Sequence, residues 1–420
     1  MLSQNRTDAF MLASSFRSGF INEELVIIEV LIIKRGKTMY FNIPTKVYFG
    51  DSVLKNFQNE IVKQGRNALI VTGKSSAIKS GVMDDLLPIL NELEIGYTVF
   101  NEIMENPDIS IVEKGKNVFL KSYGRIHAVQ NYKSYGHNHA PRNYDFIIAI
   151  GGGSPLDAAK AISIMAANDL SKEDIYNTAL HRKAFPIIAI PTTSGTGSEI
   201  TPYSVLSNEE TKVKAGFGNE FMFPKISFLD PKYTVSMSHT VTRDTAIDAL
   251  SHLLEGLYSN KYNEFLLPFI YSGIKLIYEN LSKCLKEPDN LMYRKNLMLA
   301  SNYGGIVIAH TSTTLQHSIG YPLTTIFGVS HGLANGIVMK QIMDLYEPHI
   351  KDRLDALFCF LGIKKTELFD WLDTLEMKFM GVIDECFLNE RIPEVMMSRN
   401  MTLIPYQVKE YEIIQIYESL

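Results

Sequence analysis

The sequence predicts a parallel α/β domain followed by an all-helical domain, and two patterns along the 420-residue chain support this prediction. Between about residues 67 and 200, short apolar runs alternate with helix-length stretches, as in repeated βαβ units. From about residue 240, apolar residues recur with a helical period and strand signals are missing. The length suits two domains, each with its own hydrophobic core. We therefore expect a cleft between a sheet domain and a helical domain.

Four apolar runs are expected to form strands of one parallel sheet. They are NALIVTG (67–73), IGYTVFNEI (95–103), YDFIIAIGGGS (144–154) and FPIIAIPTTSGTGSE (185–199). Continuous apolar runs that end in glycine or small polar residues are typical of strands buried on both faces. Asp230 and Pro231 interrupt the pattern, so we place the domain boundary there, with 39–230 as the α/β domain and 231–420 as the helical domain.

Two segments are expected to lie outside this plan. Residues 1–38 are interpreted as an N-terminal appendage; their apolar run, residues 24–34, is too short to span a bilayer and contains Glu29. The segment at about 121–143 contains three histidines and shows no clear period. A histidine-rich tract can bind metal, but a surface insertion is the favoured interpretation.

The composition excludes some classes of partner. Lys plus Arg is 41 and Asp plus Glu is 46, which gives a net charge of -5, so neither nucleic acid nor an anionic membrane is an expected partner. The three cysteines show no CxxC spacing, which argues against a disulfide framework and a thiolate metal site. This cysteine usage indicates a reducing compartment, so we expect a cytoplasmic protein.

Two glycine-containing turns indicate a dinucleotide site. In GGGSPLDAAKAI, glycines that allow close backbone approach stand before an expected helix N-terminus, which attracts phosphate. It is not GxGxxG, and a plain strand-to-helix turn remains an alternative. The next strand ends in PTTSGTGSEIT, which offers the hydroxyls of Thr192, Thr193, Thr196 and Ser198. Two such turns after successive strands suit a dinucleotide better than a single phosphate.

The end of the first strand bears on the choice of cofactor. Gly73 stands where an acidic side chain could hold a ribose 2′-hydroxyl, and Lys74, Ser75 and Ser76 follow it. These groups could accept a 2′-phosphate, which favours NADP(H) over NAD(H). The alternative is a plain turn with a solvated lysine.

Four residues in the helical half form a candidate metal site. Asp248 and His252 are four residues apart and share one helix face, a spacing that surface ion pairs also show. His317 and His331 stand among small and apolar residues that would leave an imidazole without partners. Together they offer one carboxylate and three imidazoles, a set that suits Fe²⁺ and also Zn²⁺.

The motifs GGGSPLDAAKAI, PTTSGTGSEIT, DALSH and HSIGYPLTTIFGVSHGLAN, in this order, resemble the iron-containing (group III) alcohol dehydrogenases. The resemblance implies a Rossmann-like N-terminal domain followed by an all-helical domain, the fold shared with dehydroquinate synthase. It implies that Asp248, His252, His317 and His331 are the metal ligands. It assigns cofactor contacts to Asn106, Gly152, Gly153, Ser154, Asp157, Thr192, Thr193 and Lys214.

One position departs from the family pattern. Many members have HxxxH where this chain has His317 followed four residues later by Tyr321. We therefore name His331 and Tyr321 as the catalytic candidates. Tyrosine can donate a hydrogen bond but, with a reference pKa of about 10, does not titrate near neutrality.

The expected reaction is reversible hydride transfer between a primary alcohol or its aldehyde and NAD(P)(H), in a homo-oligomer that acts on a small molecule. Two alternatives remain open. One is a related metalloenzyme that resembles glycerol dehydrogenase or dehydroquinate synthase, and the other is a non-catalytic protein that retains nucleotide binding.

Overall fold

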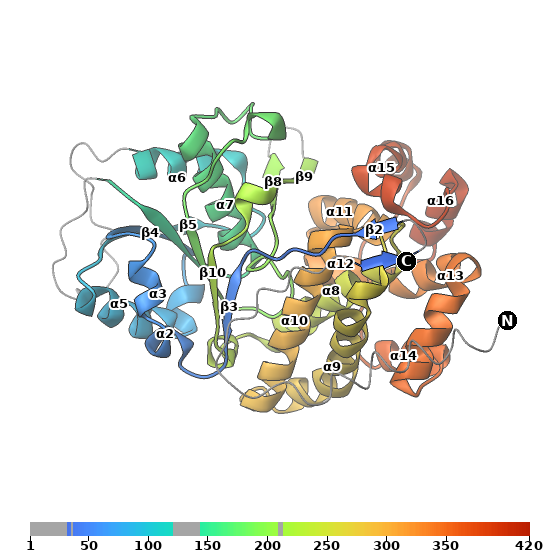
Figure 1. Cartoon of the computed structure of the whole chain (residues 1–420). Coiled ribbons are helices and arrows are strands. Elements are labelled where there is room, and N and C mark those ends of the chain that lie inside the picture. The colour runs from blue at the N-terminus through green and yellow to red at the C-terminus, as the bar shows by residue number, and fades with distance from the viewer. Residues whose placement is uncertain (1–31, 35–36, 121–142, 209–212) are drawn as a thin grey trace.

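The structure, a computed structural model, describes residues 32–34, 37–120, 143–208 and 213–420, which form a sheet domain and a helical domain. Figure 1 shows the sheet domain in blue and green on one side and the helices of the second domain in yellow to red on the other. This arrangement confirms the predicted fold class. Of the expected appendage at 1–38 and insertion at 121–143, most residues lie outside the described ranges.

The sheet contains six parallel strands in the order β3-β10-β7-β6-β4-β5. Their bounds are Lys46–Phe49 (β3), Ile226–Leu229 (β10), Ile187–Pro191 (β7), Phe146–Gly151 (β6), Asn67–Gly73 (β4) and Gly96–Ile103 (β5). The four predicted strands are β4 to β7, and β3 and β10 extend the sheet beyond β7. Since β5 and β6 flank β4 on opposite sides, the topological switch point lies where β4 and β6 end.

Helices cover both faces of the sheet. They are α2 (Val53–Asn56), α3 (Asn59–Val62), α4 (Ser76–Lys79), α5 (Val82–Glu92), α6 (Ile109–Leu120) and α7 (Gly153–Asn168). One apolar core joins α6 and α7 to one face, and another joins α2 and α5 to the opposite face. This two-sided burial explains why β6 and β7 are apolar along their whole length and β4 is apolar from Ala68 to Val71.

Two antiparallel hairpins are separate from the six-stranded sheet. One pairs β1 (Ile32–Lys34) with β2 (Lys37–Met39), inside and at the end of the segment expected to be an appendage. The other pairs β8 (Tyr203–Asn208) with β9 (Val213–Gly218) and contacts α7 and α11. The second hairpin therefore brings residues of the sheet domain to the helical domain.

The helical domain is built around α8, which is buried along most of its length. Its helices are α8 (His239–Tyr258), α9 (Leu267–Lys286), α10 (Leu291–Thr311), α11 (Leu315–Phe327), α12 (His331–Ile337), α13 (Met339–Leu361), α14 (Lys365–Asp373), α15 (Glu385–Met397) and α16 (Glu410–Glu418). Short 3-10 helices lie at Thr178–Leu180, Glu220–Met222, Pro231–Thr234, Glu264–Leu266 and Arg399–Leu403. Among the described helices, none has the length and apolarity that a membrane span requires.

Glycines allow the loop after β7 to press against the helical domain. A Cβ at Gly195 would stand 2.6 Å from the Cβ of Thr245 in α8, and one at Gly197 would stand 2.5 Å from the Cα of Gly305 in α10. Gly197 also has a φ of +61°, which favours glycine. The loop that was predicted to contact the cofactor therefore lies directly on the helices of the second domain.

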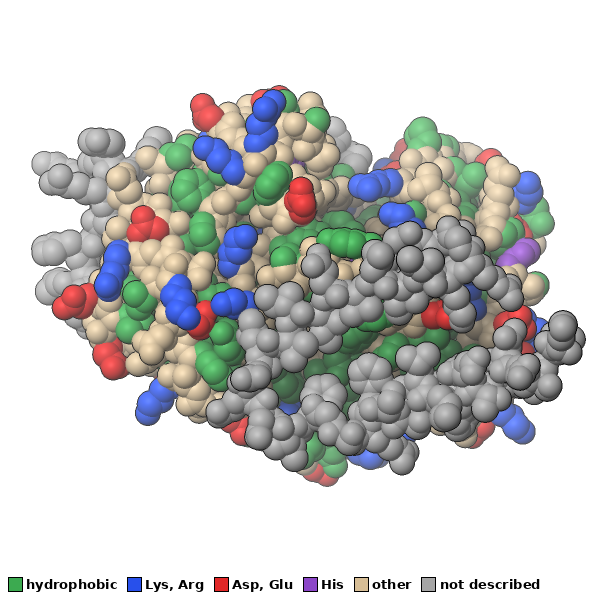
Figure 2. Space-filling view, in the orientation of Figure 1, with side chains coloured by type: hydrophobic (Ala, Val, Ile, Leu, Met, Phe, Trp, Pro, Cys, Tyr) green, Lys and Arg blue, Asp and Glu red, His purple; other side chains and the backbone are tan. Residues whose placement is uncertain are grey.

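The visible surface carries charges of both signs. Figure 2 shows basic and acidic side chains interspersed over the face of the α/β domain. This mixed pattern agrees with the small net charge of the sequence.

Candidate metal and cofactor site

Helix α8 supplies two side chains of the predicted metal site. Asp248 and His252 are one turn apart and only 3% and 4% exposed. The helix begins after Ser238, whose hydroxyl accepts a hydrogen bond from the backbone N–H of Val241 at 3.2 Å. Because α8 is buried on nearly all sides, both polar groups are held inside the domain rather than at its surface.

The other two predicted ligands come from α11 and α12. His317 is in the first turn of α11 and 2% exposed, whereas the His331 side chain, at the start of α12, is 25% exposed. Gly332 allows α12 to approach α8, since a Cβ there would stand 1.8 Å from the backbone oxygen of Asp244. The hydroxyl of Ser330 also donates a hydrogen bond to the Asp244 carboxylate. These contacts fix His331 beside α8.

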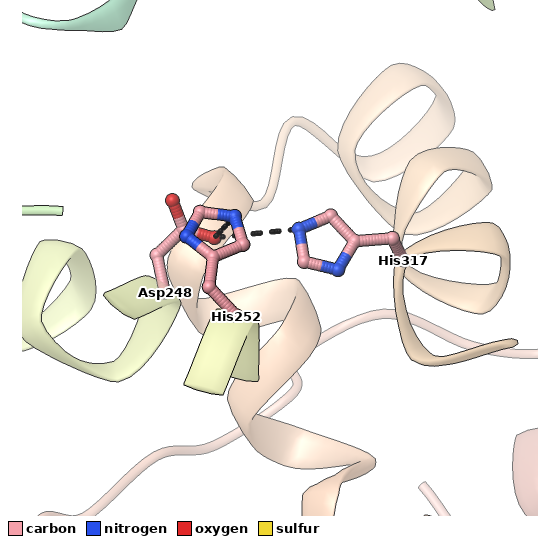
Figure 3. Close-up of side chains that lie close together, drawn as sticks. All are labelled: Asp248, His252 and His317. Atoms are coloured by element: carbon pink, nitrogen blue, oxygen red, sulfur yellow. Dashed lines mark ion pairs between the residues drawn. The ribbon is translucent and has the colours of Figure 1, made fainter. Parts of the chain in front are cut away.

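Three imidazoles converge on one carboxylate oxygen. The Nε2 atoms of His252, His317 and His331 lie 3.8, 3.7 and 3.6 Å from Oδ1 of Asp248. Figure 3 shows Asp248 and His252 facing His317 across a small gap, and these three residues form a group that could hold a metal ion. The separations are too long for hydrogen bonds.

The geometry and chemistry of these atoms fit a divalent metal. Four ligands about 2.1 Å from one ion in a tetrahedral arrangement would be about 3.4 Å from each other, close to the three separations between Asp248 Oδ1 and the imidazole Nε2 atoms. The group whose ligand atoms all lie within 4.8 Å of one another comprises Asp248, His252 and His317. One carboxylate and three imidazoles are ligands that Fe²⁺ and Zn²⁺ both accept. The residues present therefore fit the metal that the sequence predicts.

The protonation states favour metal binding at two of the imidazoles. Burial lowers the pKa of His252 and of His331, which leaves both rings neutral near pH 7. Burial alone would raise the pKa of Asp248, but the three neighbouring imidazoles and a hydrogen bond lower it to about 2. The site thus offers an ionised carboxylate and two neutral imidazoles, the forms that bind metal. His317 differs, because burial alone would lower its pKa but the charges of Glu255 and Asp248 raise it.

The two predicted phosphate-binding turns lie against each other. A Cβ at Gly152 would stand 3.1 Å from Thr193 side-chain atoms, and one at Gly153 would stand 2.7 Å from the Thr196 side chain. Gly151 has a φ of +145° at the end of β6, and Gly153 begins α7. Glycines are therefore required here for the turn to pack on the hydroxyl-rich loop, which places the N-terminus of α7 beside Thr193 and Thr196.

Asn106, Ser154 and Lys214 link three elements across this region. The backbone N–H of Asn106, which has a φ of +51°, donates to Ser154 Oγ at 3.3 Å. Lys214 Nζ in β9 donates to Asn106 Oδ1 at 2.8 Å. The structure thus brings together three residues that are far apart in the sequence and that were all predicted to contact the cofactor.

Asp157 and Ser198 form hydrogen bonds to each other and to neighbouring residues of the chain. Ser198 Oγ donates to Asp157 Oδ1 at 2.5 Å, and the backbone N–H of Val205 donates to Asp157 Oδ2 at 2.9 Å. The fully buried Lys160 donates to Ser198 Oγ at 2.7 Å and lies 3.6 Å from Asp157 Oδ1. These side chains connect α7 to the loop after β7, and sequence analysis did not single out Lys160.

Gly73 lies at the switch point with the hydroxyls that follow it. A Cβ at this position would stand 3.3 Å from both the Ile103 backbone oxygen and Ser76 Oγ. Lys74 and Ser75 are exposed at the same turn, between β4 and α4. The predicted NADP(H) determinants are therefore accessible at one end of the sheet.

Comparisons with known proteins agree with this geometry. The family model "Iron-containing alcohol dehydrogenase" matches residues 44–231, and "Fe-containing alcohol dehydrogenase family, C-terminal" matches residues 242–381. Together they cover most of the chain. The chain belongs to the iron-containing alcohol dehydrogenase family.

Several members of this family are similar to the chain. The iron-containing alcohol dehydrogenase of Thermotoga maritima has a solved structure that is 36% identical, with a TM-score of 0.80 over 90% of this chain and 98% of that one. A 1,3-propanediol dehydrogenase of Citrobacter freundii is 31% identical, and the match covers 63% of this chain and 64% of that protein. A long-chain-alcohol dehydrogenase of Geobacillus thermodenitrificans is 29% identical over 68% of each. The family resemblance inferred from the motifs is thereby confirmed.

Tyr321, at the position where the family pattern has histidine, lies between His331, a predicted metal ligand, and Lys214, a predicted cofactor contact. Its ring stacks on His331 with centroids 5.7 Å apart and an interplanar angle of 11°. Lys214 Nζ lies 5.8 Å from the centre of the Tyr321 ring. Burial, followed by the charges of Glu255 and Asp248, raises the pKa of Tyr321, so its hydroxyl stays protonated at neutral pH.

Sequence analysis missed two residues that contact the candidate ligands. Asn335 is fully buried, and its side-chain N–H donates to Asp248 Oδ1 at 3.0 Å. Glu255 is also fully buried and hydrogen-bonds to His317 Nδ1. Glu255 follows His252 by three residues on the same face of α8, which was a detectable signal. Asn335 had no such signal, because its contact depends on how α12 packs.

Changing His331 to Ala tests the four-residue site. We expect this variant to fold but to lose stoichiometric Fe²⁺ or Zn²⁺ and to lose alcohol oxidation. Its metal affinity should fall by more than the roughly 100-fold that is lost when a residue hydrogen-bonded to a metal ligand is removed. Metal analysis after dialysis and circular dichroism would measure both properties. His349→Ala is the matched control, since His349 is exposed and stacks on Tyr406. Retention of full metal content by His331→Ala would contradict the assignment.

Proposed function

We propose that this chain catalyses the reversible oxidation of a primary alcohol to its aldehyde with NADP(H) as the preferred cofactor, and that it works as a homo-oligomer. The observation that carries the proposal is the convergence of three imidazole nitrogens on Asp248 Oδ1 next to the glycine-containing turns. Family membership and the names of two relatives, which act on 1,3-propanediol and on long-chain alcohols, support the substrate class.

Residues of this chain would hold the two groups that the chemistry needs. Asp248, His252, His317 and His331 would hold a divalent metal, which acts as a Lewis acid toward the substrate oxygen. Gly152, Gly153, Ser154 and the Thr192–Thr193 pair would hold the pyrophosphate, while Lys214 would bind near a ribose and Asn106 near the adenosine part of the cofactor. The nicotinamide would donate or accept the hydride, and the protein would position the nicotinamide against the substrate.

Tyr321 is proposed to orient the substrate. Its ring lies against His331, and its protonated hydroxyl can donate a hydrogen bond to a substrate oxygen or to a water molecule. Lys214 is half-buried, and this burial lowers the pKa of its ammonium group, while the charges of Asp248 and Asp157 oppose the shift. A protonated tyrosine and a nearby lysine thus provide two donors beside the proposed metal.

The direct test is an alcohol and aldehyde panel with the full chain. Protein reconstituted separately with Fe²⁺ and Zn²⁺ is assayed with linear primary alcohols, diols, glycerol and the corresponding aldehydes, each with NADH and NADPH. We expect metal-dependent turnover of primary alcohols and aldehydes with higher kcat/KM for NADPH. Activity confined to glycerol would favour a glycerol dehydrogenase-like enzyme, and nucleotide binding without turnover of any pair would favour a non-catalytic relative.

Gly73→Asp tests the proposed preference for NADP(H). A carboxylate at Gly73 would repel a 2′-phosphate by about 3 kcal/mol at 5 Å and an effective dielectric of 20, so we expect the NADPH to NADH ratio of kcat/KM to fall about 100-fold. Gly73→Asn is the matched control, because it fills the same space, 3.3 Å from Ser76 Oγ, without the charge. Equal ratios in the Asp and Asn variants would show that selectivity lies elsewhere.

Tyr321→His tests the departure from the family pattern. A histidine at this position has a reference pKa of about 6.5, so we expect the pH profile of kcat to gain an ionisation between about pH 6 and 8. Tyr321→Phe keeps the ring against His331 without the hydroxyl and should lower kcat without a new ionisation. Identical profiles for wild type and Tyr321→His would show that this position takes no part in proton transfer.

A further inference from the structure

Glu255 is a fully buried carboxylate that joins two helices of the proposed metal site. It lies on α8 three residues after His252 and seven after Asp248, so all three project from one side of the helix. Its carboxylate does not contact Asp248; it hydrogen-bonds to Thr314 and His317 at the start of α11. Burying a carboxylate costs free energy unless several hydrogen-bond donors contact it. The hydrogen-bond partners of Glu255 should therefore show why it is buried here.

One oxygen of Glu255 caps α11. Oε1 accepts hydrogen bonds from the Thr314 backbone N–H at 2.6 Å, from the Thr314 hydroxyl at 2.8 Å and from the His317 backbone N–H at 3.4 Å. Thr314 is the N-cap residue of α11, and its own side chain makes no capping hydrogen bond. The carboxylate of a neighbouring helix therefore satisfies the first N–H groups of α11 and interacts favourably with the positive end of its dipole.

The other oxygen of Glu255 orients His317. Oε2 hydrogen-bonds to His317 Nδ1, on the side of the ring opposite the atom that lies 3.7 Å from Asp248 Oδ1. When Nδ1–H donates to a carboxylate, Nε2 keeps its lone pair and the ring is held in one orientation. The same carboxylate thus fixes both the start of α11 and the imidazole that projects from its first turn.

We propose that Glu255 is a positioning residue that presents His317 Nε2 to the metal by capping α11 and bonding to His317 Nδ1 at the same time. The proposal rests on the proposed metal site. If Glu255 had only a structural role, its substitution would lower stability through the lost capping bonds. Loss of its bond to His317 would then leave the metal affinity unchanged. Thr314 distinguishes the two roles. Its hydroxyl donates to the capping oxygen of Glu255 but does not contact a proposed metal ligand.

The test compares Glu255→Gln with Thr314→Val in the full chain. Zn²⁺ affinity is measured by competition with a chromophoric chelator, and the Tm is measured without metal. We expect Glu255→Gln to weaken Zn²⁺ binding about 10- to 100-fold, as loss of an outer-shell carboxylate does elsewhere. Thr314→Val should lower the Tm, because it removes a buried hydrogen bond, and should change Zn²⁺ affinity by less than about threefold.

Two outcomes would overturn the proposal. One is unchanged Zn²⁺ affinity in Glu255→Gln, and the other is an equal loss of affinity in Glu255→Gln and Thr314→Val. Should Glu255→Gln fail to fold, Glu255→Asp keeps the charge, shortens the side chain by one methylene and is judged by the same comparison. Wild type that binds no Zn²⁺, or whose binding survives Asp248→Asn, would instead refute the proposed metal site.

Discussion

The candidate site depends on the placement of four electron-pair donors inside an apolar domain. Three imidazole Nε2 atoms surround Asp248 Oδ1 at 3.6 to 3.8 Å, and Asp248 is only 3% exposed. Groups of this kind are costly to bury unless something pairs with them. Asn335 donates a hydrogen bond to Asp248 Oδ1, whereas the distances from this oxygen to the three imidazole nitrogens are too long for hydrogen bonds and leave room for a cation. The buried helix α8, the cap of α11 and the glycine next to His331 all serve to hold this arrangement.

The second constraint is the close approach of the two domains. Gly195 and Gly197 let the loop after β7 touch α8 and α10, and the β8–β9 hairpin carries Lys214 over the Tyr321 ring. A dinucleotide held by the turns after β6 and β7 would therefore extend toward the imidazoles without a large movement of either domain. The proposed chemistry needs this proximity, since hydride transfer requires the cofactor and the substrate to be in contact.

Much of the fold was predictable because the informative segments are local. Continuous apolar runs identified β4 to β7, and the 3.6-residue period identified α8. Strands β3 and β10 have four residues each, which is too short for a clear pattern, although β10 lies in the interior of the sheet order. For the candidate site, residue type and spacing identified Asp248 and His252. Asn335 could not be found in this way, because its contact with Asp248 depends on packing between distant segments. Lys160 follows Asp157 by three residues, but its hydrogen bond to Ser198 likewise depends on packing.

The most direct measurement is a crystal structure of the protein soaked or reconstituted with Zn²⁺, with anomalous data collected above and below the zinc edge. We expect one strong anomalous peak per chain, bound by Asp248 Oδ1 and by Nε2 of His252, His317 and His331. No peak at this position, or a peak bound by a different set of residues, would contradict the four-residue metal site.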